Sequence, residues 1–134
     1  MIKSYKDLIV WQKSIQMARL CYTLSKTFPK DELYGLTSQL RRAAVSVSAN
    51  IAEGRSRGSR KDFVQFLRIA NGSLAEVETL LTLACEFGYC SNNDIDAIHS
   101  ETSEIGKMLN TMIRQLLITK AESSKLTAES LEAA

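Results

Sequence analysis

Apolar side chains recur every three or four residues through four long segments of this chain, which places them on one face of a helix in each segment. In the third segment the spacing holds for three heptads, through Phe63, Leu67, Ala70, Leu74, Val77, Leu81 and Ala84. The 134 residues include one proline and six glycines, so few positions interrupt these segments. No segment alternates like a strand. We therefore predict an all-α fold.

Helix-breaking and helix-capping residues mark where each helix should begin and end. Helix stops are predicted where a proline or glycine follows an apolar segment, at Pro29, Gly54 and Gly88. N-caps are predicted where a serine precedes an apolar segment, at Ser59 and Ser91. These signals predict helices over about residues 6–27, 31–53, 60–87 and 93–118. Short links between them predict an antiparallel up-down-up-down four-helix bundle, one domain over residues 1–118. Residues 119–134 have weak periodicity, and we expect a frayed or disordered tail.

The first segment has two adjacent apolar stripes. One runs through Leu8, Trp11, Ile15, Ala18 and Tyr22, and the other through Val10, Met17, Cys21, Leu24 and Phe28. A face this wide predicts contact with more than one neighbouring helix.

The cysteines and the lengths of the apolar runs indicate in which cellular compartment the protein is found. Cys21, Cys85 and Cys90 are odd in number and form no CxxC pair, as expected of reduced thiols in the cytoplasm. The chain has no run of about 18 apolar residues, so we expect no contact with a membrane.

Charge is segregated along the chain behind a net value of only +2. Residues 41–68 hold seven basic and two acidic residues, a net charge of +5, whereas residues 69–106 hold seven acidic residues and no Lys or Arg. A basic segment beside an acidic one predicts either a phosphate-binding surface or head-to-tail contacts between subunits.

The densest basic cluster is Arg55, Arg57, Arg60 and Lys61, at a predicted loop and helix N-terminus. Backbone N–H groups at such a terminus favour anions, and the guanidinium fork suits phosphate. With Arg41, Arg42 and Arg68, these residues form a candidate nucleic-acid-binding set; the alternative is a solvated basic loop.

A polar stripe follows the second helix beside its apolar face, through Gln39, Arg42, Ser46, Asn50 and Glu53. Glu76 and Glu78 on the next helix are possible partners for Arg41 or Arg42, because a buried arginine must be paired. We predict a structural or interface network of Gln39, Asn50, Glu53, Glu76 and Glu78 rather than a catalytic site.

The sequence contains no recognisable catalytic or metal-binding motif. A di-iron bundle needs two Glu-x-x-His motifs, but the single histidine, His99, has Asp96 at the third position before it. No Ser or Cys stands with a His base in a recognisable nucleophile motif, and GRSRG lacks the ending of a phosphate loop. We predict a non-enzymatic protein without a metal or cofactor.

Three stretches of the sequence are similar to a known protein family: DLIVWQKSIQMA, FPKDELYGLTSQLRRAAVSVSANIAEG and SRKDFVQFLRIANGSLAEVETLLTLACEFGY. They resemble the four-helix-bundle family named for the 23S rRNA intervening sequence, over about residues 5–118. The resemblance implies a left-handed bundle that assembles as a homopentamer. More distantly, the chain resembles the accessory variability protein of diversity-generating retroelements, which implies a reverse transcriptase and nucleic acid as partners.

Two functions remain open. The first is an oligomeric adaptor that binds RNA or DNA through its basic segment, with phosphate contacts that weaken in salt. The second is a protein-interaction scaffold without a nucleic-acid role, in which the charge segregation serves subunit assembly.

Overall fold

The computed structural model describes residues 2–118. It contains two short 3-10 turns, η1 and η2, and four α-helices, α1 to α4. In chain order these are η1 (Tyr5–Asp7), α1 (Ile9–Ser25), η2 (Lys30–Glu32), α2 (Leu36–Ser56), α3 (Arg60–Glu86) and α4 (Asn92–Leu116). No strand occurs among the described residues, so the predicted all-α class is confirmed. The expected tail over residues 119–134 lies outside them.

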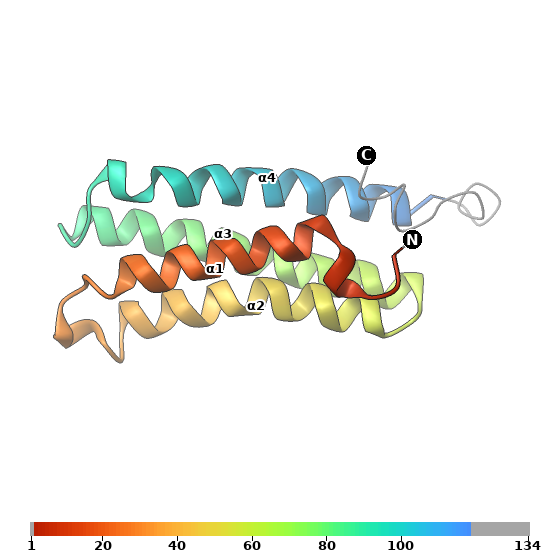
Figure 1. Ribbon diagram of the computed structural model, residues 1–134, viewed down its shortest axis with the longest axis horizontal. Helices are drawn as coiled ribbons and strands as arrows, with labels where there is room; N and C mark the ends of the chain where they lie inside the picture. The colour runs from red at the N-terminus through yellow and green to blue at the C-terminus, as the bar shows by residue number, and fades with distance from the viewer. Residues whose placement is uncertain (1, 119–134) are drawn as a thin grey trace.

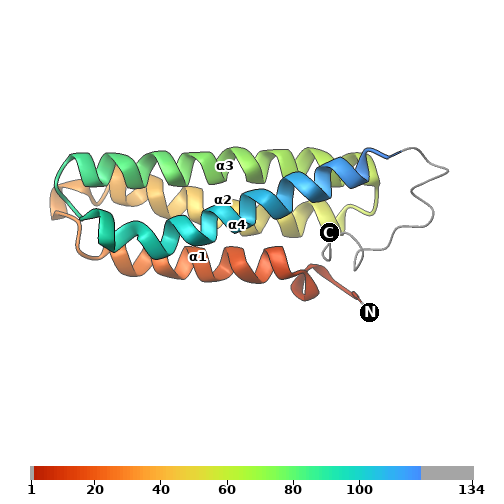
Figure 2. The same cartoon turned by 90° about the horizontal axis from the view of Figure 1, so that it is seen from above.

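The four helices alternate in direction and form one bundle (Figures 1 and 2). Each helix packs against its neighbours in the chain, and α1 closes the ring by packing against α4. Every member of the predicted stripe on α3 is buried, and so is the equivalent stripe on α4. The α4 stripe consists of Ile95, Ile98, Thr102, Ile105, Leu109, Met112 and Leu116. The predicted four-helix bundle is confirmed.

The two stripes of α1 are buried to different extents. Val10, Met17 and Cys21 of the second stripe are fully buried, with the hydroxyl-bearing Ser14 between them. The Ser14 hydroxyl donates to the carbonyl of Trp11 at 2.6 Å, so its burial leaves no donor unpaired. In the first stripe Leu8 is fully buried, but Trp11 is only partly buried and Tyr22 is 40% exposed, so beyond Leu8 this stripe flanks the core.

Helix α2 begins at Leu36, five residues later than predicted. Pro29 starts the 3-10 turn η2 instead of an α-helix, and Leu33 is 48% exposed. Glu32 caps α2 by accepting from the Leu36 N–H at 3.1 Å, and it accepts from the Tyr89 hydroxyl at 2.6 Å. The Tyr89 bond lowers the pKa of the Glu32 carboxyl and raises the pKa of Tyr89. Glu32 therefore joins the α1–α2 link to the α3–α4 link.

Gly54 does not end α2, as the sequence predicted, because the helix continues to Ser56. Gly54 is buried where α2 meets α3. A Cβ atom on it would lie 2.7 Å from the Cβ of Phe66 and 3.1 Å from the Cδ1 of Phe63. The glycine therefore permits a close approach of the two helices, whose packing is the most extensive in the bundle.

Helix α1 spans Ile9–Ser25 rather than the predicted residues 6–27, because Leu8 is extended and Tyr5–Asp7 form the separate turn η1. At the other helix ends, local backbone geometry agrees with the glycine and serine signals of the sequence. Gly58 and Gly88 adopt φ values of +85° and +80°, a left-handed conformation that suits glycine. Ser59 caps α3 by accepting from the Asp62 N–H at 3.1 Å, and Ser91 and Asp94 form a capping box at the start of α4.

Candidate nucleic-acid interface

The turn between α2 and α3 gathers the densest predicted basic cluster. Arg55 lies in the last turn of α2, Arg57 follows that helix, and Arg60 and Lys61 open α3. Figure 1 shows this turn at the same end of the bundle as η1 and the last turn of α4. We call this region the basic end and define it by Arg55, Arg57, Arg60, Lys61, Arg68 and Arg114.

Two arginines of the basic end differ in their surroundings. The Nε of Arg57 donates to Glu53 Oε2 at 3.0 Å, and its guanidinium lies 5.2 Å from the ring centre of Phe66. The Arg57 side chain is nevertheless 52% exposed, so it can still face a ligand. Arg55 is half-buried, and its Nε has no hydrogen-bond partner within the described part of the chain.

A groove of about 780 Å³ lies between the start of α3 and the end of α4. Its lining combines cationic and apolar side chains: Arg60, Lys61, Val64, Gln65, Arg68, Leu116, Leu117 and Ile118. Sequence reasoning identified the three cations but missed the residues from α4. The antiparallel order of the helices could have revealed them, because it places the end of α4 beside the start of α3.

Arg41 and Arg42 are separated from the basic end. Arg42 and Arg55 are thirteen positions apart on helix α2, a rise of about 20 Å. The Nε of Arg41 donates to Ser25 Oγ at 2.9 Å, and its guanidinium lies 4.9 Å from the ring centre of Tyr22. Arg42 is exposed. The predicted basic set therefore divides into two groups on different parts of the bundle.

The residues of the predicted polar network make separate local contacts. The Asn50 amide donates to Ser46 O and Oγ at 2.8 and 2.9 Å, and Ser73 Oγ on α3 donates to the same Ser46 Oγ at 2.9 Å. This chain of bonds links α2 to α3. Glu53 pairs with Arg57, as described above.

The remaining members of that network do not meet the arginines in this monomer. Glu78 accepts from Thr102 Oγ1 at 3.2 Å and so faces α4. Gln39 and Glu76 are exposed. No Arg41 or Arg42 ion pair with Glu76 or Glu78 forms within residues 2–118. A pairing between subunits stays a prediction.

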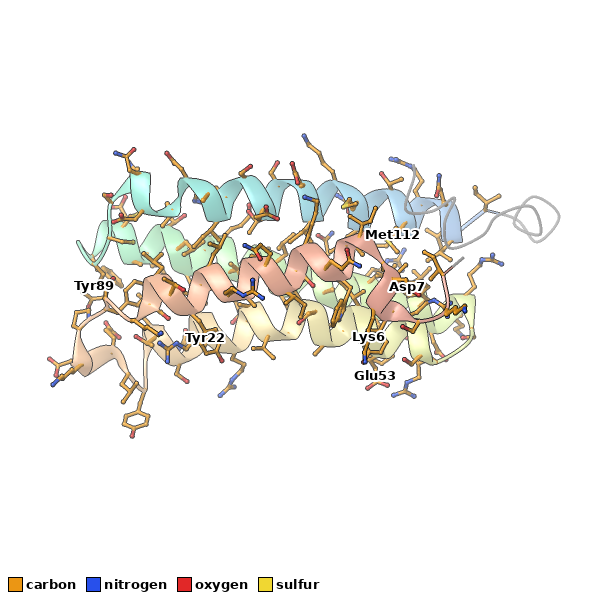
Figure 3. The ribbon with its side chains drawn as sticks, in the orientation of Figure 1. Lys6, Asp7, Tyr22, Glu53, Tyr89 and Met112 are labelled. Carbon is orange, nitrogen blue, oxygen red and sulfur yellow. The ribbon has the colours of Figure 1, made fainter. Side chains whose placement is uncertain are left out.

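The fold converts the segregated charges into two differently charged regions. The acidic segment, residues 69–106, covers most of α3 and the adjoining first part of α4, toward the end opposite the basic end (Figure 2). Figure 3 shows Lys6 and Glu53 at the basic end and Tyr22 and Tyr89 toward the other end. The basic end can therefore bind an anion at a distance from most of the acidic side chains.

The structure also places the cysteines and the potential metal ligands of the described residues. Among them, no group of three His, Cys, Asp or Glu side chains is placed to hold a metal ion. The sulfur atoms of Cys85 and Cys90 lie 3.6 Å apart, a weak thiol contact. Burial raises the pKa of the Cys21 and Cys90 thiols to about 12.

We expect Cys21 and Cys90 to react slowly with iodoacetamide at pH 8. Because the thiolate is the nucleophile, a raised pKa keeps each group in its unreactive protonated form. Mass spectrometry after timed labelling should show rates at least about tenfold lower in the native protein than in the urea-unfolded chain. Equal native and unfolded rates would contradict this prediction.

The described residues include no helix with the length and apolar character needed to cross a membrane. The family model described as 23S rRNA-intervening sequence protein matches residues 6–111. A search of curated proteins returns no match.

One similar solved structure is a protein of unknown function from the S23 ribosomal protein family of Bacteroides thetaiotaomicron. It is 29% identical in sequence and superposes with a TM-score of 0.73. The match covers 79% of the present chain and 99% of the Bacteroides chain.

Proposed function

This chain belongs to the 23S rRNA-intervening sequence protein family, and from that premise we propose a non-enzymatic, oligomeric four-helix-bundle protein that binds RNA through its basic end. We place it in the cytoplasm, where its three free thiols stay reduced.

The observation that carries the proposal is the concentration of cations at the basic end. Arg57, Arg60, Lys61 and Arg68 are all exposed there, and they come from one turn and the first part of α3. Glu53 offsets part of the Arg57 charge, and Asp62 lies in the first turn of α3. A cationic end of this kind suits phosphate groups, which supply most of the affinity in sequence-independent binding.

The aromatic residues favour backbone contacts over base stacking. The exposed aromatic side chains of the described chain are Tyr22, Tyr34 and Phe87. All three lie toward the end opposite the basic end, since Tyr22 is in the last turn of α1, Tyr34 precedes α2 and Phe87 follows α3. Phe66 lies beneath Arg57. Single-stranded binding usually needs aromatic platforms beside the cations. We therefore propose a structured RNA, contacted along its phosphates, as the ligand.

A salt titration with an RNA hairpin tests this function. Four exposed cations that each neutralise one phosphate predict a slope of about −3 for log K against log salt concentration. Fluorescence anisotropy with a labelled hairpin, from about 50 to 200 mM KCl, measures the slope. A duplex DNA of the same length shows whether the contact depends on RNA geometry. Absence of hairpin binding at the lowest salt concentration would reject the function.

We also propose that the protein assembles as a homopentamer. Exposed apolar and small side chains on the outer faces of α2 and α3 support assembly, since Val45 and Ile69 are each 45% exposed and Ala49 lies one turn from Val45. Multi-angle light scattering on the purified protein should give five times the 14.9 kDa mass of one chain. A mass of one chain at micromolar concentration would contradict the pentamer.

A further inference from the structure

The groove between α3 and α4 has a composition that phosphate binding does not explain. Its floor is apolar, formed by Val64, Leu116 and Leu117. Leu117 is 59% exposed, the largest exposed fraction among the large aliphatic side chains of the described residues. Leu117 lines the same groove as the nearly buried Val64 and Leu116, so an apolar ligand there would remove Leu117 from water and contact all three side chains. An RNA backbone would cover Leu117 without any apolar contact in return.

The rim of the groove defines the charge of its occupant. Arg60, Lys61 and Arg68 all contribute to the lining, whereas no acidic residue among residues 2–118 does. The volume of about 780 Å³ is within the range of roughly 300–1,000 Å³ that is common for ligand-binding sites. An occupant that matches both features has an apolar face and acidic flanks.

The spacing of the cations favours a helical occupant. Arg60 and Arg68 are eight residues apart on α3, a rise of about 12 Å, or two helical turns. Carboxylates eight residues apart on a second helix repeat at the same distance. A helix laid between two antiparallel helices also packs its apolar side chains into the groove that they form.

We propose that the α3–α4 groove binds an acidic amphipathic helix of a partner protein. Leucine-like side chains of that helix cover Val64, Leu116 and Leu117, and its carboxylates pair with Arg60, Lys61 and Arg68. This inference goes beyond the proposed RNA contact and does not depend on it, because the apolar floor contributes nothing to phosphate binding.

The test uses the full chain and a synthetic peptide of about 18 residues, long enough to hold a helix. Leucines recur every three or four positions in the peptide, and glutamates flank them. A control peptide has the same composition, with the leucines moved out of that spacing. In fluorescence anisotropy, the periodic peptide should bind at least about tenfold more tightly than the control, because only the periodic one buries its leucines together.

Matched variants locate the peptide. Leu117→Ser should weaken peptide binding about tenfold and Arg68→Ala several-fold. Leu83→Ser and Arg42→Ala change an exposed leucine and an exposed arginine outside the groove, and they should leave binding unchanged. RNA binding by Leu117→Ser should equal that of the unaltered protein, which separates this proposal from the RNA function.

Three results would overturn the proposal. The first is equal binding of the two peptides, which indicates attraction by charge alone. The second is unchanged binding by Leu117→Ser. The third is no saturable binding of either peptide, whether another segment of the chain occupies the groove or nothing does.

Discussion

RNA affinity should fall about thirtyfold when Arg57, Lys61 and Arg68 are all replaced by alanine. Each replacement removes one exposed cation from the basic end without opening the core. Each phosphate contact is taken to contribute about 0.7 kcal/mol of binding free energy, a value near the low end for hydrogen bonds. The loss of three contacts then removes about 2 kcal/mol, which corresponds to the thirtyfold decrease in affinity. The salt slope should also become less negative by about 2, because fewer counterions are released from the RNA.

A control variant with the same change in net charge separates a local site from general attraction. Arg19, Lys26 and Arg42 are exposed elsewhere on the bundle, and their combined replacement by alanine also removes three positive charges. We expect this variant to lose less than about threefold in affinity. If both triple variants lose affinity equally, RNA responds to the overall charge, and the basic end is not its binding site.

Gly54→Ala should destabilise the bundle by about 1–3 kcal/mol, the usual range for overpacking a core. The added methyl group would lie 2.7 Å from the Phe66 Cβ and 3.1 Å from Phe63, so helices α2 and α3 must move apart. The Phe66 contact involves a Cβ atom, which cannot move without its backbone. Urea unfolding monitored by circular dichroism measures the change.

Gly72→Ala is the matched control, because Gly72 lies in the middle of α3 with nothing within 4 Å of an added Cβ. This variant should be more stable than the unaltered protein by about 0.8–1.0 kcal/mol, since alanine is the better helix former. If Gly54→Ala also raised stability, the close approach of α2 and α3 would not depend on glycine.

The helices were predictable because their signals are local. The stripes on α3 and α4 need only the spacing of apolar residues along one segment, and Gly88 and Ser91 act on the backbone beside them. The prediction at Gly54 was wrong because, in the sequence alone, a glycine that ends a helix cannot be distinguished from one that permits close packing of two helices. The atoms that distinguish them belong to Phe63 and Phe66 in the next helix.

The start of α2 depended on a long-range contact as well. Tyr89, 57 residues along the chain, donates to the Glu32 side chain that caps this helix. Spacing within residues 29–36 does not reveal this bond, and Leu33 fits the three- and four-residue spacing of Leu36 and Leu40 although it is 48% exposed. Helix periodicity therefore overestimated the length of α2 at its N-terminus.

The candidate site was predictable where its residues are close in sequence. Arg55, Arg57, Arg60 and Lys61 lie around one turn, so the fold keeps them together. Arg41 and Arg42 share that segment by residue number, but the length of α2 separates them from it. Leu117 became part of the groove through the antiparallel return of α4, which composition does not reveal.

The separation of charge along the bundle has a kinetic consequence. A rod that is positive at one end and negative over much of the opposite half has an electric dipole along its axis, and the field of a polyanion exerts a torque on it. At physiological ionic strength this field decays over about 8 Å, whereas the 27 residues of α3 span about 40 Å. The torque therefore acts mainly in the last ångströms of approach. There it rotates the leading basic end toward the polyanion and turns the acidic half away. Because added salt shortens the range of the field, the rate of productive encounters falls as salt is added.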